Sequence, residues 1–298
     1  MVGATQELIA KPELVSVIIP THNRGMTIRR SIESVLLQRH EEFEIIVVDD
    51  NSEDNTQEII RDYRDSRITY LKNEKNIGAQ GSRIIGMNIA KGTYVAFLDS
   101  DDTLTNISIT SRIAALKQSG YSDALVYGKF LYKSEIEVES NFERLAGNVY
   151  KQILRNLSLC GYPAILLTKK CITIAGLPNA DFPSWQDDDF VLTIAKQFPV
   201  VYCDEVVAII YPSEHSIVRD YNTVIRGCEM IAAKYRNEIV KTFGIHYVVL
   251  WKMRTLRLRM LQKLSMTHTS RSFEIATVKY CLRILDWILR PFFTRIFT

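Results

Sequence analysis

Residues 95–102 read VAFLDSDD, an apolar run that ends abruptly at three carboxylates, Asp99, Asp101 and Asp102. The apolar half is typical of a buried strand. Carboxylates this close together repel one another unless a cation or strong hydrogen-bond donors lie among them. In open α/β sheets, ligands bind outside the carboxyl ends of the strands. The segment therefore predicts a divalent-metal site at the end of a buried strand.

The chain before this segment alternates between strand and helix patterns. Apolar, β-branched runs predict strands over 14–20, 43–48, 67–71 and 93–98, and helical spacing predicts helices over 26–39, 55–64 and the later part of 76–92. This alternation predicts a parallel α/β sheet. The chain after it is expected to form helices over 106–119, 149–157 and 184–198 and strands over 124–132, 164–168 and 200–211.

The 298 residues are 47% apolar and 24% charged, which is ordinary for a globular protein with a large core. The charge is unevenly distributed. Residues 224–298 hold 14 Lys and Arg against 4 Asp and Glu, whereas residues 1–223 hold 23 against 30. Such asymmetry indicates an anionic surface partner. We expect a catalytic domain over 1–222 and a basic, helical C-terminal extension over 223–298.

The cysteines and the N-terminus point to a reducing compartment. Five widely spaced cysteines include no CxxC pair, so the sequence favours neither a zinc site nor a disulfide framework. The first 14 residues lack the apolar core of a signal peptide, and the chain contains no apolar run of about 18 residues. We expect a cytoplasmic protein, associated peripherally with the cytoplasmic face of the membrane.

Acidic groups stand at three places: Asp49 with Asp50 and the Asp99–Asp102 segment follow predicted strands, and residues 187–189 stand at the start of a predicted helix. Each alone has a purely structural interpretation, because Asp and Asn form turns after strands and acids favour helix N-termini. Their conjunction favours a metal-dependent site. The first strand is followed by PTHNRG, neither a Walker loop nor GxGxxG, so a phosphate-bearing ligand would be held mainly by Mg²⁺ or Mn²⁺.

Four motifs, in order along the chain, resemble those of family 2 glycosyltransferases. They are SVIIPTHNR at 16–24, IIVVDDNSEDNT at 45–56, NIGAQGSRIIG followed by AKGTYVAFLDSDD over 76–102, and SWQDDDF at 184–190. The resemblance covers about 15–215. It implies the GT-A fold, a Rossmann-like, mostly parallel sheet flanked by helices, and inverting transfer from a nucleotide sugar, usually UDP-linked, with Mn²⁺ or Mg²⁺ at a DxD motif.

The resemblance also implies roles for individual residues. By position, the donor site would comprise Pro20, Thr21, His22, Arg24, Asp50 at the base, Arg83 near the base and phosphates, Asp99 and Ser100. Asp101 would be the main metal ligand, with Asp99 and His215 as further ligands. Asp187 falls at the position of the catalytic base, which would take the proton of the acceptor hydroxyl. The usual Glu-Asp pair is Gln186-Asp187 here, so Asp188 and Asp189 compete for this role.

The resemblance implies a glycosyltransferase for cell-surface glycans, acting on a glycan or a lipid-linked saccharide. The QxxRW signature of processive synthases is absent, so we expect one sugar to be added per encounter. A catalytically silent nucleotide-sugar-binding scaffold is the main alternative. A sugar-phosphate nucleotidyltransferase is a third, but it would carry a glycine-rich phosphate loop after the first strand.

The basic tail has two interpretations. Amphipathic helices bearing Trp287, Phe292 and Phe293 would dock on an anionic membrane surface. Alternatively, the tail packs on the body or on another subunit with its basic face solvated. We do not expect nucleic acid as a partner, because the body is acidic and lacks nucleic-acid motifs.

Overall fold

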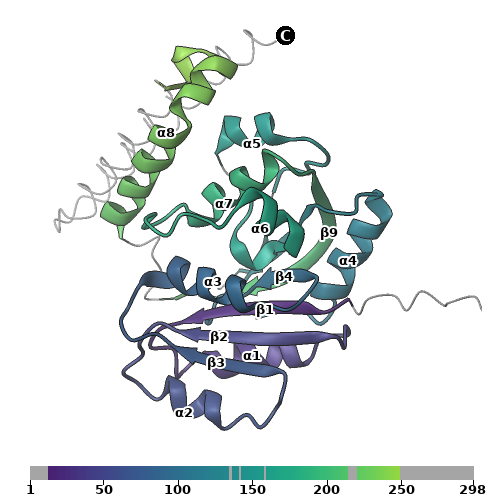
Figure 1. Cartoon of the computed structure of the whole chain (residues 1–298), viewed down its shortest axis with the longest axis vertical. Coiled ribbons are helices and arrows are strands. Elements are labelled where there is room, and N and C mark those ends of the chain that lie inside the picture. The colour runs from purple at the N-terminus through teal and green to yellow at the C-terminus, as the bar shows by residue number, and fades with distance from the viewer. Residues whose placement is uncertain (1–12, 134–135, 141, 158, 214–219, 249–298) are drawn as a thin grey trace, which may run out of the picture. The chain divides into compact units, whose positions relative to one another are not determined.

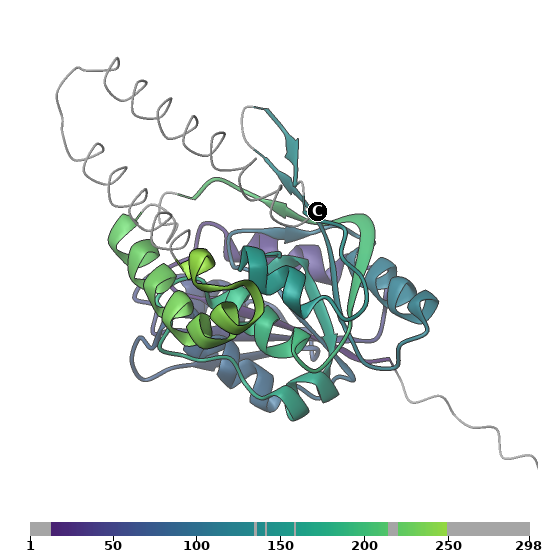
Figure 2. The same ribbon diagram turned by 90° about the horizontal axis from the view of Figure 1, so that it is seen from above.

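The computed structural model describes residues 13–133, 136–140, 142–157, 159–213 and 220–248. The chain divides into two units, residues 1–216 and residues 217–298. The first unit contains a nine-stranded sheet in the order β3-β2-β1-β4-β8-β6-β9-β5, with β7 paired to β6. Helices flank this curled sheet (Figure 1 and Figure 2).

The first half of the sheet is parallel, as the sequence predicts. Its strands and helices are β1 (Val15–Thr21), α1 (Ile28–Leu36), β2 (Phe43–Asp49), α2 (Thr56–Arg61), β3 (Ile68–Lys72), α3 (Gly78–Ile89) and β4 (Tyr94–Phe97). Every side chain of β1 and β4 is buried. Continuous apolar runs form such strands because helices cover both of their faces.

The strand order reverses at β1, which pairs with β2 on one side and with β4 on the other. Ile18 therefore lies opposite both Ile46 and Phe97. Because strand crossovers are right-handed, this reversal puts α1 and α3 on opposite faces of the sheet (Figure 1). Open α/β sheets bind ligands outside the carboxyl ends of the strands at such a reversal. The residues after Thr21 and after Phe97 meet there.

The second half of the sheet is mixed. Its elements are β5 (Thr103–Leu104), α4 (Ser108–Ser119), β6 (Leu125–Tyr132), β7 (Val138–Glu139), α5 (Tyr150–Asn156), the 3₁₀ turn η1 (Tyr162–Ala164), β8 (Ile165–Thr168), α6 (Lys169–Ala175), α7 (Gln186–Ala195) and β9 (Val200–Ile210). Strand β8 runs antiparallel between β4 and β6, so the parallel pairing that the sequence predicts does not extend through the whole sheet. The sequence pattern misses β5 and β7 because two residues show no period.

Two close contacts fix the elements around the strand reversal. At Gly86 a Cβ atom would lie 2.5 Å from Ile18 Cγ2, so the glycine lets α3 approach β1 closely. Arg112 of α4 is fully buried, and its guanidinium donates to the carbonyl oxygens of Ala164 and Ile165 at 3.2 and 2.8 Å. It thereby ties α4 to the start of β8.

In the second unit, the described residues form α8 (Tyr221–Phe243). Asp220 caps this helix by accepting a hydrogen bond from Asn222 N, and the helix ends at Gly244, where φ is +88°. Among the described residues, no helix is both long and apolar enough to cross a membrane. The predicted extension over 223–298 lies largely outside the described residues, including Trp287, Phe292 and Phe293, and its role stays a prediction.

Candidate active site

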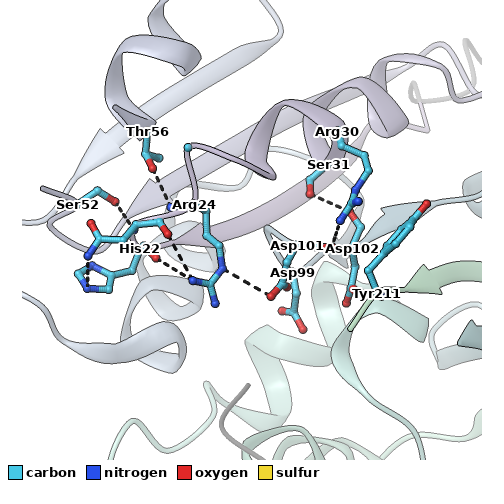
Figure 3. A network of polar contacts seen from close by, with 12 residues as sticks. His22, Arg24, Arg30, Ser31, Ser52, Thr56, Asp99, Asp101, Asp102 and Tyr211 are labelled. Atoms are coloured by element: carbon cyan, nitrogen blue, oxygen red, sulfur yellow. Dashed lines mark hydrogen bonds and ion pairs between the residues drawn. The ribbon is translucent and has the colours of Figure 1, made fainter. Parts of the chain in front are cut away.

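The turn between β1 and α1 is fastened to the turn between β2 and α2. His22 Nδ1 lies 2.9 Å from the backbone oxygen of Asp50. Asn23 adopts a positive φ of 51°, and its backbone N–H donates to Ser52 Oγ at 2.9 Å. Arg24 N donates to Thr56 Oγ1 at 2.9 Å (Figure 3). The residues predicted to line the nucleoside pocket, including Pro20 and the buried Thr21 at the end of β1, therefore lie on or beside two turns that hydrogen bonds join.

Asp50 has a structural task that the sequence does not indicate. Its buried carboxylate accepts hydrogen bonds from the backbone N–H groups of Ile77 and Gly78, at 2.8 and 2.7 Å, and from Asn73 Nδ2 at 2.9 Å. These bonds fix the start of α3 to the end of β2. Contact of Asp50 with a nucleotide base stays a prediction.

The turn after β4 separates its three carboxylates. Asp102 N donates to Asp99 O at 3.0 Å, which closes the turn around the buried Ser100. The Asp99 side chain is 36% exposed and the Asp101 side chain 21%. Each lies near an arginine. Arg83 Nη2, on α3, is 2.6 Å from Asp99 Oδ1. Arg24 Nε, in the turn between β1 and α1, is 3.6 Å from Asp101 Oδ2 (Figure 3).

Asp102 turns away from this pair. Its carboxylate is buried and accepts a hydrogen bond from Tyr211 N at 3.0 Å, while its backbone oxygen accepts one from Ser31 Oγ at 2.7 Å (Figure 3). Arg30 stacks on the Tyr211 ring at 3.6 Å and donates to Asp101 O at 2.6 Å. Burial, reinforced by the nearby charges of Asp99 and Asp101, raises the pKa of Asp102 to about 8. Asp102 is thus a supporting residue of the turn.

Arg83 joins the acidic turn to α7. It is buried on α3, where its Nη1 donates to Gln186 Oε1 at 3.3 Å and its Nη2 donates to Asp99. Its guanidinium carbon lies 4.1 Å above the ring of Tyr162, which is a favourable cation–π geometry. Segments from four distant parts of the chain therefore meet at this one side chain.

Asp187, Asp188 and Asp189 form the first turn of α7, directly after Trp185, which has a positive φ of 60°. Asp188 and Asp189 are buried, whereas Asp187 is half-buried. A Cβ atom at Gly161 would lie 3.5 Å from Asp187 Oδ2, so the glycine leaves space at this carboxylate. Burial raises the pKa of Asp187; the positive charge of Arg83 opposes this effect. A raised pKa suits a general base.

Comparison with known proteins shows which proteins the chain resembles. The family model described as glycosyl transferase family 2 matches residues 16–161. WfgD of Escherichia coli, a UDP-Glc:alpha-D-GlcNAc-diphosphoundecaprenol beta-1,3-glucosyltransferase, is 31% identical over 75% of this chain and 77% of its own. WfaP of Escherichia coli carries the same activity in its name and is 33% identical over 60% of this chain and 68% of its own.

The chain belongs to glycosyltransferase family 2. Its fold matches that of TarS from S. aureus in complex with UDP-GlcNAc, with a TM-score of 0.62 and 21% identity over 78% of this chain and 69% of that one. This likeness identifies the GT-A fold. The chain is a glycosyltransferase, and the recognised motifs predict its family and enzyme class correctly.

The carboxylates at the acidic turn of this glycosyltransferase fit a divalent cation. Among the described residues, no group of three or more His, Cys, Asp or Glu side chains is arranged to hold a metal ion. Two partly exposed carboxylates, Asp99 and Asp101, nevertheless offer the hard oxygen ligands with which Mg²⁺ is held when substrate phosphates and water complete its shell. His215, the third predicted ligand, lies outside the described residues.

The contacts of five residues at this site carry no sequence signal. Arg30, Ser31 and Tyr211 hold the acidic turn, while Tyr162 and Gln186 hold Arg83. In the sequence, Gln186 stands out only as a departure from the family motif. The contacts of Tyr211 and Gln186 span 109 and 103 residues, a distance over which periodicity carries no information.

Proposed function

We propose that the protein transfers a single sugar, with inversion, from a UDP-sugar to a saccharide carried on a lipid diphosphate, and that the reaction depends on Mn²⁺ or Mg²⁺. One observation carries the proposal: Arg83 contacts both Asp99 at the strand reversal and Gln186, the residue before Asp187. Arg83 thus links the turn that carries Asp99 and Asp101 to the helix that carries the candidate base, Asp187.

On the donor side, the double turn around His22 and Arg24 would form the wall of the nucleoside pocket. Asp99 and Asp101 would hold the cation through carboxylate oxygens. When bound, the cation neutralises the charge that develops on the departing nucleoside diphosphate. Arg24 and Arg83 lie near these carboxylates and would contact phosphate oxygens as well.

On the acceptor side, Asp187 would accept the proton of the attacking hydroxyl. Asp187 is half-buried at the start of α7, whereas Asp188 and Asp189 are buried, which favours Asp187 over its two neighbours. Attack from the side opposite the leaving group inverts the anomeric centre. Asp187 then carries the proton that the hydroxyl has lost.

The relatives support the substrate classes. WfgD, WfaP and a GalNAc(5)-diNAcBac-PP-undecaprenol beta-1,3-glucosyltransferase of Campylobacter jejuni, 34% identical over 43% of this chain and 41% of its own, are all named for acceptors linked to undecaprenol through a diphosphate. We therefore propose a lipid-linked acceptor and UDP-glucose as the first donor to test. The excess of basic residues over 224–298 would favour contact with the anionic surface that carries such an acceptor.

The test combines a donor screen with an acceptor. The full chain is incubated with Mn²⁺, UDP-glucose, UDP-galactose or UDP-GlcNAc, and a GlcNAc-diphosphate-lipid acceptor, and the product is analysed by mass spectrometry and anomeric NMR. We expect one added hexose in a beta linkage and loss of activity with EDTA. An alpha linkage would overturn the inverting assignment, and absence of transfer from every donor would favour the scaffold alternative.

A variant test addresses the metal ligand. Asp101→Ala should abolish Mn²⁺-dependent UDP binding and turnover, because it removes one of two available carboxylates. Asp62→Asn provides a control, since the side chain of Asp62 is 76% exposed and its Oδ2 lies 4.0 Å from Arg29 Nη2. Unchanged activity of Asp101→Ala would refute the metal assignment.

Sedimentation with vesicles of anionic and of neutral phospholipids tests the proposed membrane contact.

A further inference from the structure

We propose that Arg83 and Gln186 form a bridge that positions the first turn of α7, and with it Asp187, relative to the donor-binding turn. The inference rests on the proposed function for the roles of Asp99 and Asp187. It makes Gln186 a positioning residue for the transfer reaction. It also gives Arg83 a task in addition to the phosphate contact predicted for it.

The bridge begins at α3, whose start is fixed by Asp50 and whose body packs against β1 at Gly86. The Arg83 side chain is only 7% exposed. Its bond to Asp99 is short, at 2.6 Å, and charge-assisted bonds of this kind are about twice as strong as neutral ones. Arg83 therefore has little freedom to leave its place.

The far end of the bridge is an oriented amide. Gln186 Oε1 accepts from Arg83 Nη1 at 3.3 Å, and Gln186 Nε2 donates to Phe182 O at 2.7 Å. Both ends of the amide are thus engaged, which fixes the side chain at the first residue of α7. Because Gln186 is neutral, it does not compete with Asp99 for the positive charge of Arg83.

Aromatic rings also connect the two helices that the bridge joins. Arg83 lies over the ring of Tyr162, whose hydroxyl donates to Gln80 Oε1 at 3.0 Å, one turn earlier on α3. Tyr162 in turn stacks on Phe190 of α7, with ring centroids 5.9 Å apart. The polar link through Gln186 and the stacked rings therefore connect α3 and α7 at two separate points.

The functional consequence lies in the reaction step more than in donor binding. A displacement of about 1 Å can cost as much as 100-fold in rate when reacting groups must be aligned. Loss of the Gln186 contact leaves the bond between Arg83 and Asp99 in place. We expect Gln186→Met to lower kcat by about 10- to 100-fold and to change the KM for UDP-glucose by less than about twofold.

A double-mutant cycle tests the bridge. Arg83→Lys, Gln186→Met and the double variant are compared in kcat, KM for UDP-glucose and affinity for UDP with Mn²⁺. Two residues that act through one contact give a double variant whose loss is smaller than the product of the single losses. Gln186→Glu keeps an acceptor for Arg83 and should retain more of kcat than Gln186→Met. Gln197→Met, at an exposed residue just beyond α7, provides the control.

A measurement without substrate separates this inference from the proposed function. Hydrogen exchange of the peptide covering 184–190 should become faster in Gln186→Met and Arg83→Lys and stay unchanged in Gln197→Met. Unaltered exchange, multiplicative losses in the cycle, or a loss confined to UDP affinity would each overturn the bridge. If the wild type transfers no sugar while exchange changes as expected, the proposed function fails and the bridge stands as a structural link.

Discussion

Replacing Asp102 with asparagine should remove a pH dependence from the stability of the fold. Burial and two neighbouring carboxylates raise the pKa of Asp102 from 3.8 to about 8 in the folded protein. Between these values the folded state holds a proton that the unfolded chain has released. The wild type therefore loses stability as the pH rises from about 4 to about 8.

The magnitude follows from the size of the shift. Each pKa unit corresponds to about 1.4 kcal/mol. A shift of roughly four units therefore means that the charged Asp102 lowers the unfolding free energy above pH 8 by at most about 6 kcal/mol. The pKa of about 8 already contains the opposing effect of the Arg30 charge. Relaxation of the folded protein around a charged Asp102 lowers the cost below this limit. We expect the wild type to lose about 2–3 kcal/mol more than Asp102→Asn between pH 5 and pH 8.

Urea unfolding followed by far-UV circular dichroism in EDTA, at pH values from 5 to 9, measures this difference. Asparagine keeps an acceptor oxygen for Tyr211 N, so the variant should fold and have a flatter pH profile. Asp62→Asn changes an exposed carboxylate and should reproduce the wild-type profile. Parallel profiles of wild type and Asp102→Asn, or a wild type that gains stability toward pH 8, would refute the reasoning.

Two further predictions concern the base and the fold. Because burial raises the pKa of Asp187, the rate should fall on acidification from a higher pH than for an ordinary aspartate, and Asp187→Asn should lower kcat by about 1,000-fold; a pH–rate profile with no acidic limb would contradict this. Gly92→Ala should lower the unfolding free energy by more than about 2 kcal/mol in urea titrations, because its Cβ would lie 2.6 Å from Leu14 O and 2.7 Å from Ser16 N. Gly120→Ala meets no atom within 4 Å and should cost only about 1 kcal/mol through its positive φ, so an equal loss at both glycines would disprove the steric argument.

The sequence predicted most of the fold because buried strands leave a strong local signal. β1 and β2 are continuous apolar runs, and the alternation with helices predicts their parallel pairing. The sequence could not predict that β8 runs antiparallel, because a four-residue apolar run does not indicate the direction of its strand in the sheet. The two-residue strands were missed for a similar reason.

The site was predictable only in part. The acidic cluster predicted a ligand-binding turn, and the structure divides its carboxylates into an open pair and the inward-facing Asp102. That division depends on Tyr211, which lies 109 residues away. Asp50 was predicted to contact a base, and its bonds to the start of α3 depend on backbone geometry that no motif encodes. The roles of Asp187 and the metal ligands stay predictions.

The strand reversal also determines when, during folding, the protein acquires a site. The contacts of Arg83 with Gln186 and of Asp102 with Tyr211 each join residues that are more than 100 positions apart in the chain. Such long-range closures are slow, because chain entropy is lost before the contacts form. An intermediate containing only β1, β2 and β3 would display the turns around His22 without the acidic turn or α7. On the proposed function, donor binding would require the acidic turn to have joined the turns around His22, so it would report on a late stage in the folding of this unit.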